Sequence, residues 1–159
     1  MRYLLIPAFL FIFSTGCGKD DDPPGPTKTD HLTSSAWKYD SGGVDQDRNG
    51  TIDFTFAATG LLQPCVLDNT GTFLANNTGT TDEGLTKCST AAPQTSTFNW
   101  GFTNNETMIN ISGSGLLGIG GQFKVITLTP TVFSLSKDTL VTIPPLPATT
   151  VSLIVNLKH

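Results

Sequence analysis

Hydrophobic and polar residues alternate over short stretches of the chain from Ser34 onward, and this two-residue period is typical of β-strands with one buried face. In the clearest case, Phe98, Trp100 and Phe102 fall on one face of a predicted strand, and the Asn104-Asn105 turn leads into the next apolar run. No stretch shows a convincing helical period. Strands are expected over residues 36–39, 71–74, 79–81, 97–102, 107–111, 123–128, 132–136 and 151–157.

About eight short strands with short connections in chain order predict an all-β fold. We expect a small antiparallel meander β-barrel; a sandwich is the alternative if the sheet does not close. The chain has 159 residues, enough for one domain with a working core. It contains 16 Gly and 10 Pro and only 14% charged residues, which suits a turn-rich extracellular domain.

The first residues of the chain have the pattern of a secretory signal. Arg2 supplies a positive charge, residues 4–13 are apolar but too few to span a bilayer, and Ser14-Thr15-Gly16 precedes Cys17. The pattern resembles the lipobox of bacterial lipoproteins, in which the cysteine thiol receives a diacylglycerol and cleavage falls before it; Ser14 stands where leucine is usual. The resemblance implies a signal peptide over residues 1–16 and lipidation of Cys17.

An acidic, Pro- and Thr-rich tether is predicted over residues 17–33, followed by one barrel domain over residues 34–159. Lys19-Asp20-Asp21-Asp22 resembles the signal that sends Bacteroidota lipoproteins to the cell surface. We therefore expect attachment to the outer membrane by the lipid alone, with the domain facing the cell exterior. The net charge is −4 and the few lysines are scattered, which argues against a nucleic-acid partner.

Three cysteines are present, and lipidation of Cys17 leaves Cys65 and Cys88 as the remaining pair. In an oxidising compartment, two remaining thiols indicate one disulfide. The spacing does not match a Cys-x-x-Cys redox motif, and a zinc site would need more ligands.

A family resemblance covers most of the predicted domain. The runs that carry it are 65–73 (CVLDNTGTF), 82–88 (DEGLTKC), Gln94-Thr95 and Phe98-Asn99-Trp100. They resemble the lipocalin-like lipoproteins of Bacteroidota, and the resemblance implies a small meander barrel and a Cys65–Cys88 bridge. It implies little about activity, because a shared fold does not fix a function. Residues 113–121 and 143–147 depart from a minimal member, and we expect the chain's own specificity there.

The sharpest chemical motif is the run from Asp45 to Asp53. It matches the first nine positions of an EF-hand calcium loop, with Gly50 at the tight turn. Position twelve is Phe56 instead of a bidentate glutamate, so a distant carboxylate such as Asp68 or Asp82 would have to complete the site. The alternative is a solvated acidic turn, and the sequence leaves both open. The expected ligands are Asp45, Asp47, Asn49, the Thr51 carbonyl and Asp53.

Catalytic constellations are nearly absent from the sequence. The two histidines, His31 and His159, lie in the predicted tether and at the carboxy terminus, so no nucleophile has a credible base. Asp82 and Glu83 would point to opposite faces of a strand. We therefore do not expect an enzyme.

The predicted inward-facing residues leave two functions open. Either they enclose a small or apolar ligand in a lipid-anchored surface lipoprotein, or they form a dry core in a non-catalytic interaction module, an accessory part of a cell-surface complex. The first function is the leading hypothesis. The residues expected to line the interior are Trp37, Phe73, Phe98, Trp100, Phe102, Val151, Leu153 and Val155.

Overall fold

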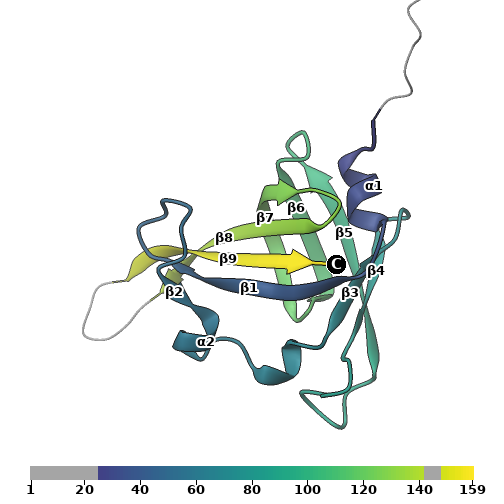
Figure 1. Ribbon diagram of the computed structural model, residues 1–159, viewed down its shortest axis with the longest axis horizontal. Coiled ribbons are helices and arrows are strands. Elements are labelled where there is room, and N and C mark those ends of the chain that lie inside the picture. The colour runs from purple at the N-terminus through teal and green to yellow at the C-terminus, as the bar shows by residue number, and fades with distance from the viewer. Residues whose placement is uncertain (1–24, 142–147) are drawn as a thin grey trace, which may run out of the picture.

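The computed structural model describes residues 25–141 and 148–159 and shows an all-β protein built on one antiparallel sheet (Figure 1). Its helical segments in this part of the chain are short: α1 (Lys28–Thr33), α2 (Phe56–Thr59) and the 3-10 helix η1 (Pro64–Val66). The strands are β1 (Trp37–Asp45), β2 (Phe54–Thr55), β3 (Thr70–Phe73), β4 (Thr78–Asp82), β5 (Thr95–Thr103), β6 (Met108–Leu116), β7 (Ile119–Leu128), β8 (Val132–Val141) and β9 (Thr149–Lys158).

The strands pair in chain order and the sheet closes into a ring. β3 to β9 pair successively, β1 pairs with β3, and β9 returns to β1 along a register that runs from Lys38↔Lys158 to Asp45↔Ser152. β2 lies beside the ring and pairs only with the end of β1. The predicted all-β meander barrel is therefore confirmed, because the remaining strands close it without crossing connections.

Aromatic side chains fill one half of the barrel. Trp37, Phe73, Phe98 and Phe133 are fully buried. Their ring centroids lie 5.5 Å apart for Trp37 and Phe133, 5.2 Å for Phe73 and Phe98, and 6.0 Å for Phe73 and Phe133. Burying each of these side chains stabilises the fold by roughly 1.5–3 kcal/mol.

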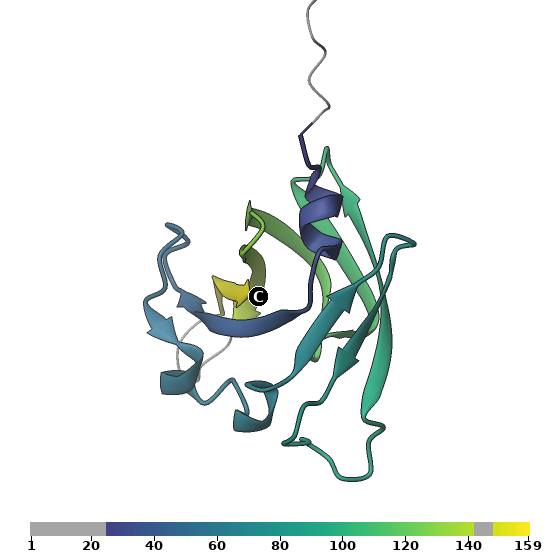
Figure 2. The same ribbon diagram turned by 45° about the vertical axis from the view of Figure 1, so that its right-hand side comes forward.

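Helix α1 lies over one end of the barrel, as Figures 1 and 2 both show, and its Leu32 belongs to the same core cluster as the aromatic residues. Thr27 caps its first turn in a reciprocal capping box with Asp30. Leu32 is fully buried, and its carbonyl accepts a hydrogen bond of 2.9 Å from Nε1 of Trp37. The structure thus corrects the predicted boundary: residues 28–33 belong to the folded domain, and with one buried apolar residue the helix is too short to show a period.

The glycine-rich segment 113–121 forms the end of the β6–β7 hairpin, which turns into the opposite pole. Leu117 and Gly118 form its two-residue turn with φ angles of 51° and 79°. Leu116 and Leu117 are 0% and 5% exposed. The Thr81 hydroxyl donates to the Gly115 carbonyl (3.2 Å) and accepts from the Leu117 N–H (3.3 Å), which holds the turn against β4.

Several expectations concern residues that lie outside the described ranges. These are the signal peptide over residues 1–16, the lipidation site Cys17, the surface signal at 19–22 and the proline-rich departure at 143–147. Among the residues that are described, no helix has the length and apolar character needed to cross a membrane.

Candidate functional site

A cavity of about 340 Å³ lies at the pole opposite α1. Side chains from β1, β7, β8 and β9 form its walls, and α2, η1, the segment between them and the β6–β7 turn surround it. The residues that line it are Tyr39, Phe56, Leu61, Leu62, Val66, Leu117, Ile119, Gly120, Phe123, Lys137, Leu153 and Val155.

The segment between β2 and β3 supplies one side of this cavity. α2 begins at its N-cap Thr55, whose side chain accepts the Ala58 N–H, and ends at the left-handed Gly60. Phe56 is 8% exposed and packs into the core from this short helix. Leu61 and Leu62 follow, and η1 then begins at Pro64, whose ring suits the first turn of a helix.

The disulfide Cys65–Cys88 holds η1 to the loop after β4, with the two Cα atoms 5.2 Å apart, and the predicted pairing is confirmed. The buried Asn69 stabilises the same junction. With its side-chain nitrogen facing the two carbonyls, it donates to Cys65 O at 3.0 Å and to Glu83 O at 2.7 Å. The bridge therefore fixes the wall of the cavity that Val66 belongs to.

Three polar groups interrupt the apolar lining: the Tyr39 phenol, the Gly120 backbone and the Lys137 ammonium. Burial raises the pKa of the Tyr39 phenol, and the neighbouring Asp40 carboxylate adds to the shift. The phenol therefore keeps its proton at neutral pH. A mostly apolar pocket with a few polar groups is the usual composition of a small-molecule site.

The structure brings only part of the predicted ligand-binding set to this cavity. Leu153 and Val155 line it, and Val151 lines an adjoining apolar depression of about 530 Å³ together with Leu153. The five predicted aromatic residues do not line the cavity. Trp37, Phe73, Phe98 and Trp100 belong to the core cluster, and Phe102 packs against it; Trp100 and Phe102 also border two depressions away from the cavity.

Most of the cavity residues were missed by the sequence analysis. Phe56, Leu61, Leu62 and Val66 lie in a segment without alternation, where no strand is predicted. Lys137 lies one residue beyond the end expected for its strand, which in fact continues to Val141. The apolar character of residues 61–62 was the available signal, but nothing in the sequence showed which surface they would cover.

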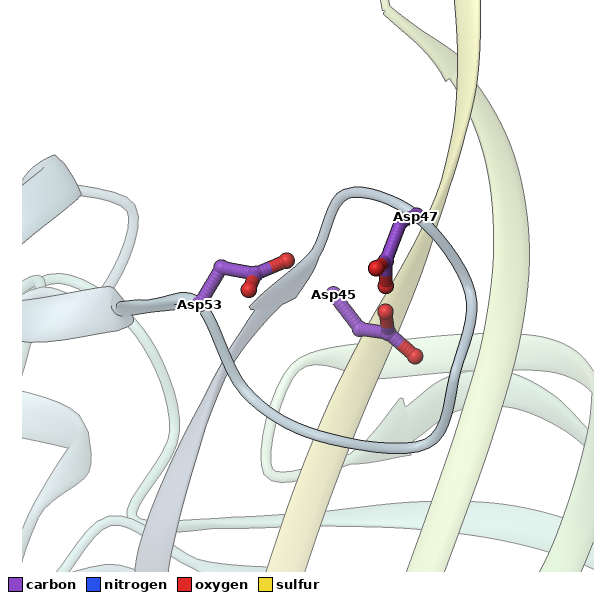
Figure 3. A group of neighbouring side chains, drawn as sticks. All are labelled: Asp45, Asp47 and Asp53. Atoms are coloured by element: carbon purple, nitrogen blue, oxygen red, sulfur yellow. The ribbon is translucent and has the colours of Figure 1, made fainter.

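A second cluster lies in the loop between β1 and β2 (Figure 3). Asp45, Asp47 and Asp53 each offer one carboxylate oxygen, and the three oxygens lie within 4.8 Å of one another. Asp45 is 1% exposed, whereas Asp47 and Asp53 are exposed. Two oxygens bound to one calcium ion at about 2.4 Å can be at most about 4.8 Å apart, so each pair of these oxygens meets this upper limit.

Backbone hydrogen bonds shape this loop. Asp45 accepts from Asn49 N (3.1 Å) and Gly50 N (2.8 Å), and Asp53 accepts from Gln46 N (2.8 Å). The Asn49 side-chain oxygen accepts from Thr51 N at 2.8 Å, which places both residues inside the same turn. Of the predicted ligand set, the structure brings the three aspartates together, and Asn49 and Thr51 lie in the same loop.

The distant carboxylates suggested to complete the site do not reach it. Asp68 accepts from Leu85 N and Thr86 N, and Asp82 accepts from Gly84 N and the Gln94 side chain. Asp138 of β8 comes closer instead: it lies 3.7 Å from Arg48 of the loop, and both line one depression with Asp45 and Asp47.

Phe56, the twelfth position of the loop motif, is a buried core residue on α2. The chain therefore leaves the EF-hand path after Asp53. The two histidines also serve structural contacts: His31 lies on α1, and His159 stacks on Trp37 with centroids 3.8 Å apart.

Comparison with known proteins identifies no relative: no family model matches the sequence, and no curated protein or solved structure matches the chain significantly. Any functional conclusion must therefore come from the cavity, the acidic loop and the sequence patterns.

Proposed function

We propose that the protein is a lipid-anchored lipoprotein of the outer-membrane surface whose lipocalin-like barrel binds a small apolar ligand. The cavity carries the proposal, because its volume of about 340 Å³ and its aliphatic and aromatic walls fit a small-molecule site. The pattern that ends at Cys17 supports the anchor, and Lys19-Asp20-Asp21-Asp22 supports the surface location. A non-catalytic interaction module with a filled barrel is the alternative, and the cavity favours ligand binding over it.

The test is calorimetry with decanol, a small apolar probe, on the full-length chain carrying Cys17→Ser, which needs no detergent. Native mass spectrometry of the wild-type protein from its own host would identify the natural ligand. Leu153→Trp, which fills the cavity, is expected to abolish decanol binding. Thr150→Trp is the matched control. Thr150 is an exposed residue of the same strand, and it lines neither the cavity nor the adjoining apolar depression. Absence of any decanol binding by the parent protein would favour the interaction module.

We also propose that the loop between β1 and β2 holds a calcium ion. The convergence of Asp45, Asp47 and Asp53 supports the site. No residue occupies the bidentate twelfth position, so weak affinity is expected. The ion would stabilise the loop at the end of β1 and take no part in catalysis.

Calcium is expected to raise the melting temperature of the protein, because it binds only the folded loop. Asp47→Ala should abolish the shift, whereas Asp40→Ala, which removes an exposed carboxylate of β1 outside the loop, should leave it intact. Magnesium should substitute poorly because it demands a tighter octahedral shell. If millimolar calcium produces neither heat nor a thermal shift, the loop is an acidic turn only.

A further inference from the structure

Lys137 is the one charged residue among those that line the cavity. On β8, Phe133, Leu135 and Lys137 alternate, and the first two are fully buried in the core. Their partners across β9 are Leu157, Val155 and Leu153, and the last two line the cavity with Lys137. Because side chains at every second position share a face, Lys137 lies on the interior face of the barrel.

The Lys137 ammonium makes few contacts within the described residues. It donates one hydrogen bond to the Gly120 carbonyl at 3.0 Å and lies 5.4 Å from the centre of the Phe123 ring. It also lies directly against the backbone of β7, since a Cβ atom at Gly121 would be 2.6 Å from its Nζ. An ammonium has three donors, so two remain for another acceptor.

Lys137 has no carboxylate partner within residues 25–141 and 148–159. The ion pairs found there join Arg48 to Asp138 and Lys158 to Asp40. Asp138, its neighbour on β8, lines the outer depression beside the acidic loop and not the cavity. The interior wall therefore carries one positive charge that no charged group of the described chain compensates.

The ammonium is open to a ligand in the cavity, and a charge-assisted hydrogen bond is among the strongest that such a ligand can make. We propose that the ligand of the cavity is an anionic amphiphile, whose apolar chain fills the aliphatic walls and whose anionic head accepts hydrogen bonds from Lys137. This inference rests on the proposed ligand-binding function and names the chemical class of the ligand. The volume of about 340 Å³ lies near the small end of ligand pockets, which selects a medium-length chain.

The test compares decanoate with decanol, which share a chain and differ in the charge of the head group. Calorimetry at neutral pH uses the full-length chain carrying Cys17→Ser. We expect decanoate to bind about tenfold more tightly than decanol. Lys137→Met should remove this preference and leave the affinity for decanol unchanged. Lys124→Met is the matched control, because Lys124 is an exposed lysine on β7 that does not line the cavity, and it should keep the preference.

If the parent protein binds decanoate and decanol with equal affinity, the proposal of an anionic ligand is wrong. The proposal of an apolar binding site would not be affected. A preference for decanoate that survives in Lys137→Met would overturn the role of Lys137. Failure of the parent protein to bind either probe would overturn the proposed function as well. The comparison on the parent protein decides the ligand class even if the Lys137 variant does not fold.

Discussion

The carboxylate of Asp68 binds the backbone of the loop after β4. Its Oδ2 accepts the backbone N–H groups of Leu85 and Thr86 at 2.8 and 2.9 Å, next to the disulfide at Cys88. The hydrogen bond from Thr86 N–H, followed by that from Leu85, lowers the pKa of the carboxyl below its ordinary value of 3.8. The charged form of Asp68 is therefore the form that the folded loop favours.

This lowered pKa predicts an acid-dependent contribution to stability. A carboxyl whose pKa is lower in the folded state stabilises the fold fully above its unfolded pKa, and this contribution is lost as pH falls through the folded pKa. Asp68→Asn should therefore melt a few degrees below the parent at neutral pH, and the difference should vanish in strong acid. Thermal unfolding of both proteins from neutral pH to about pH 2 measures this.

Asp40→Asn serves as the comparison, since Asp40 is exposed, lies outside this loop and forms an ion pair with Lys158. A melting difference for Asp68→Asn that stays constant down to strong acid would show that the carboxylate charge does not hold the loop.

The aromatic residues show why the sequence predicts the buried face of a strand but not what that face does. The alternation of Phe98 and Trp100 correctly predicted one buried face, because a period of two is set by strand geometry alone. Whether such a face encloses a ligand or packs as a dry core depends on the side chains opposite. Phe73 and Phe133 come from other strands and fill that space, so the predicted aromatic site became core.

At the scale of elements, the disulfide joins η1 to the loop after β4 across a sequence separation of 23 residues. On the chain-entropy model, a bridge of this span stabilises the fold by roughly 2–4 kcal/mol. Reducing agent should therefore lower the free energy of unfolding of the Cys17→Ser protein by that amount. Denaturant titration with and without reductant measures it.

The Cys65→Ser/Cys88→Ser double variant is the control, and it should be insensitive to reductant and as stable as the reduced parent. Free thiols at both positions in protein exported by the native host would contradict the bridge.

The end of the β6–β7 hairpin packs against Gly71 of β3, a position where a larger residue would leave too little room. A Cβ atom at Gly71 would lie 2.0 Å from Cδ1 of the fully buried Leu116. Gly71→Ala should therefore destabilise the protein by about 1–3 kcal/mol through overpacking. A double-mutant cycle with Leu116→Ala should show that the two changes are not additive, because the smaller side chain removes the collision. Additive effects would show that this hairpin does not pack on Gly71.

The sequence predicted the strands better than the short helices. Strands with clear alternation were placed within a few residues, since burial of one face leaves a local signal. α1, α2 and η1 were missed because a helix of one or two turns is stabilised by caps and by tertiary packing, here through Leu32 and Phe56. The cluster of Asp45, Asp47 and Asp53 could be predicted because these residues lie close together in sequence, whereas the cavity is assembled from distant segments.

At the scale of the whole molecule, the proposed attachment to the membrane would depend on the thiol of Cys17. Cys17→Ser should leave the protein unlipidated and release it from the membrane fraction, because no other apolar anchor is expected. Labelling with a palmitate analogue, followed by fractionation, measures both effects. A variant that still labels and sediments with membranes would show that the protein is not a lipoprotein anchored at Cys17.

Replacing Lys19, Asp20, Asp21 and Asp22 by alanine is the companion variant. It should keep the lipid and lose access to protease added outside the cell. Unchanged protease access would remove the argument for a surface location.

Helix α1 packs at one pole of the barrel and so fixes where the N-terminal part of the chain joins the domain. It is held to the aromatic pole by Trp37 and Leu32, and by Lys28, which donates to the Glu106 carbonyl at 2.7 Å. The chain from the proposed anchor thus enters the domain at the pole opposite the cavity. The point where this chain joins the folded domain is therefore separated from the cavity by the aromatic core.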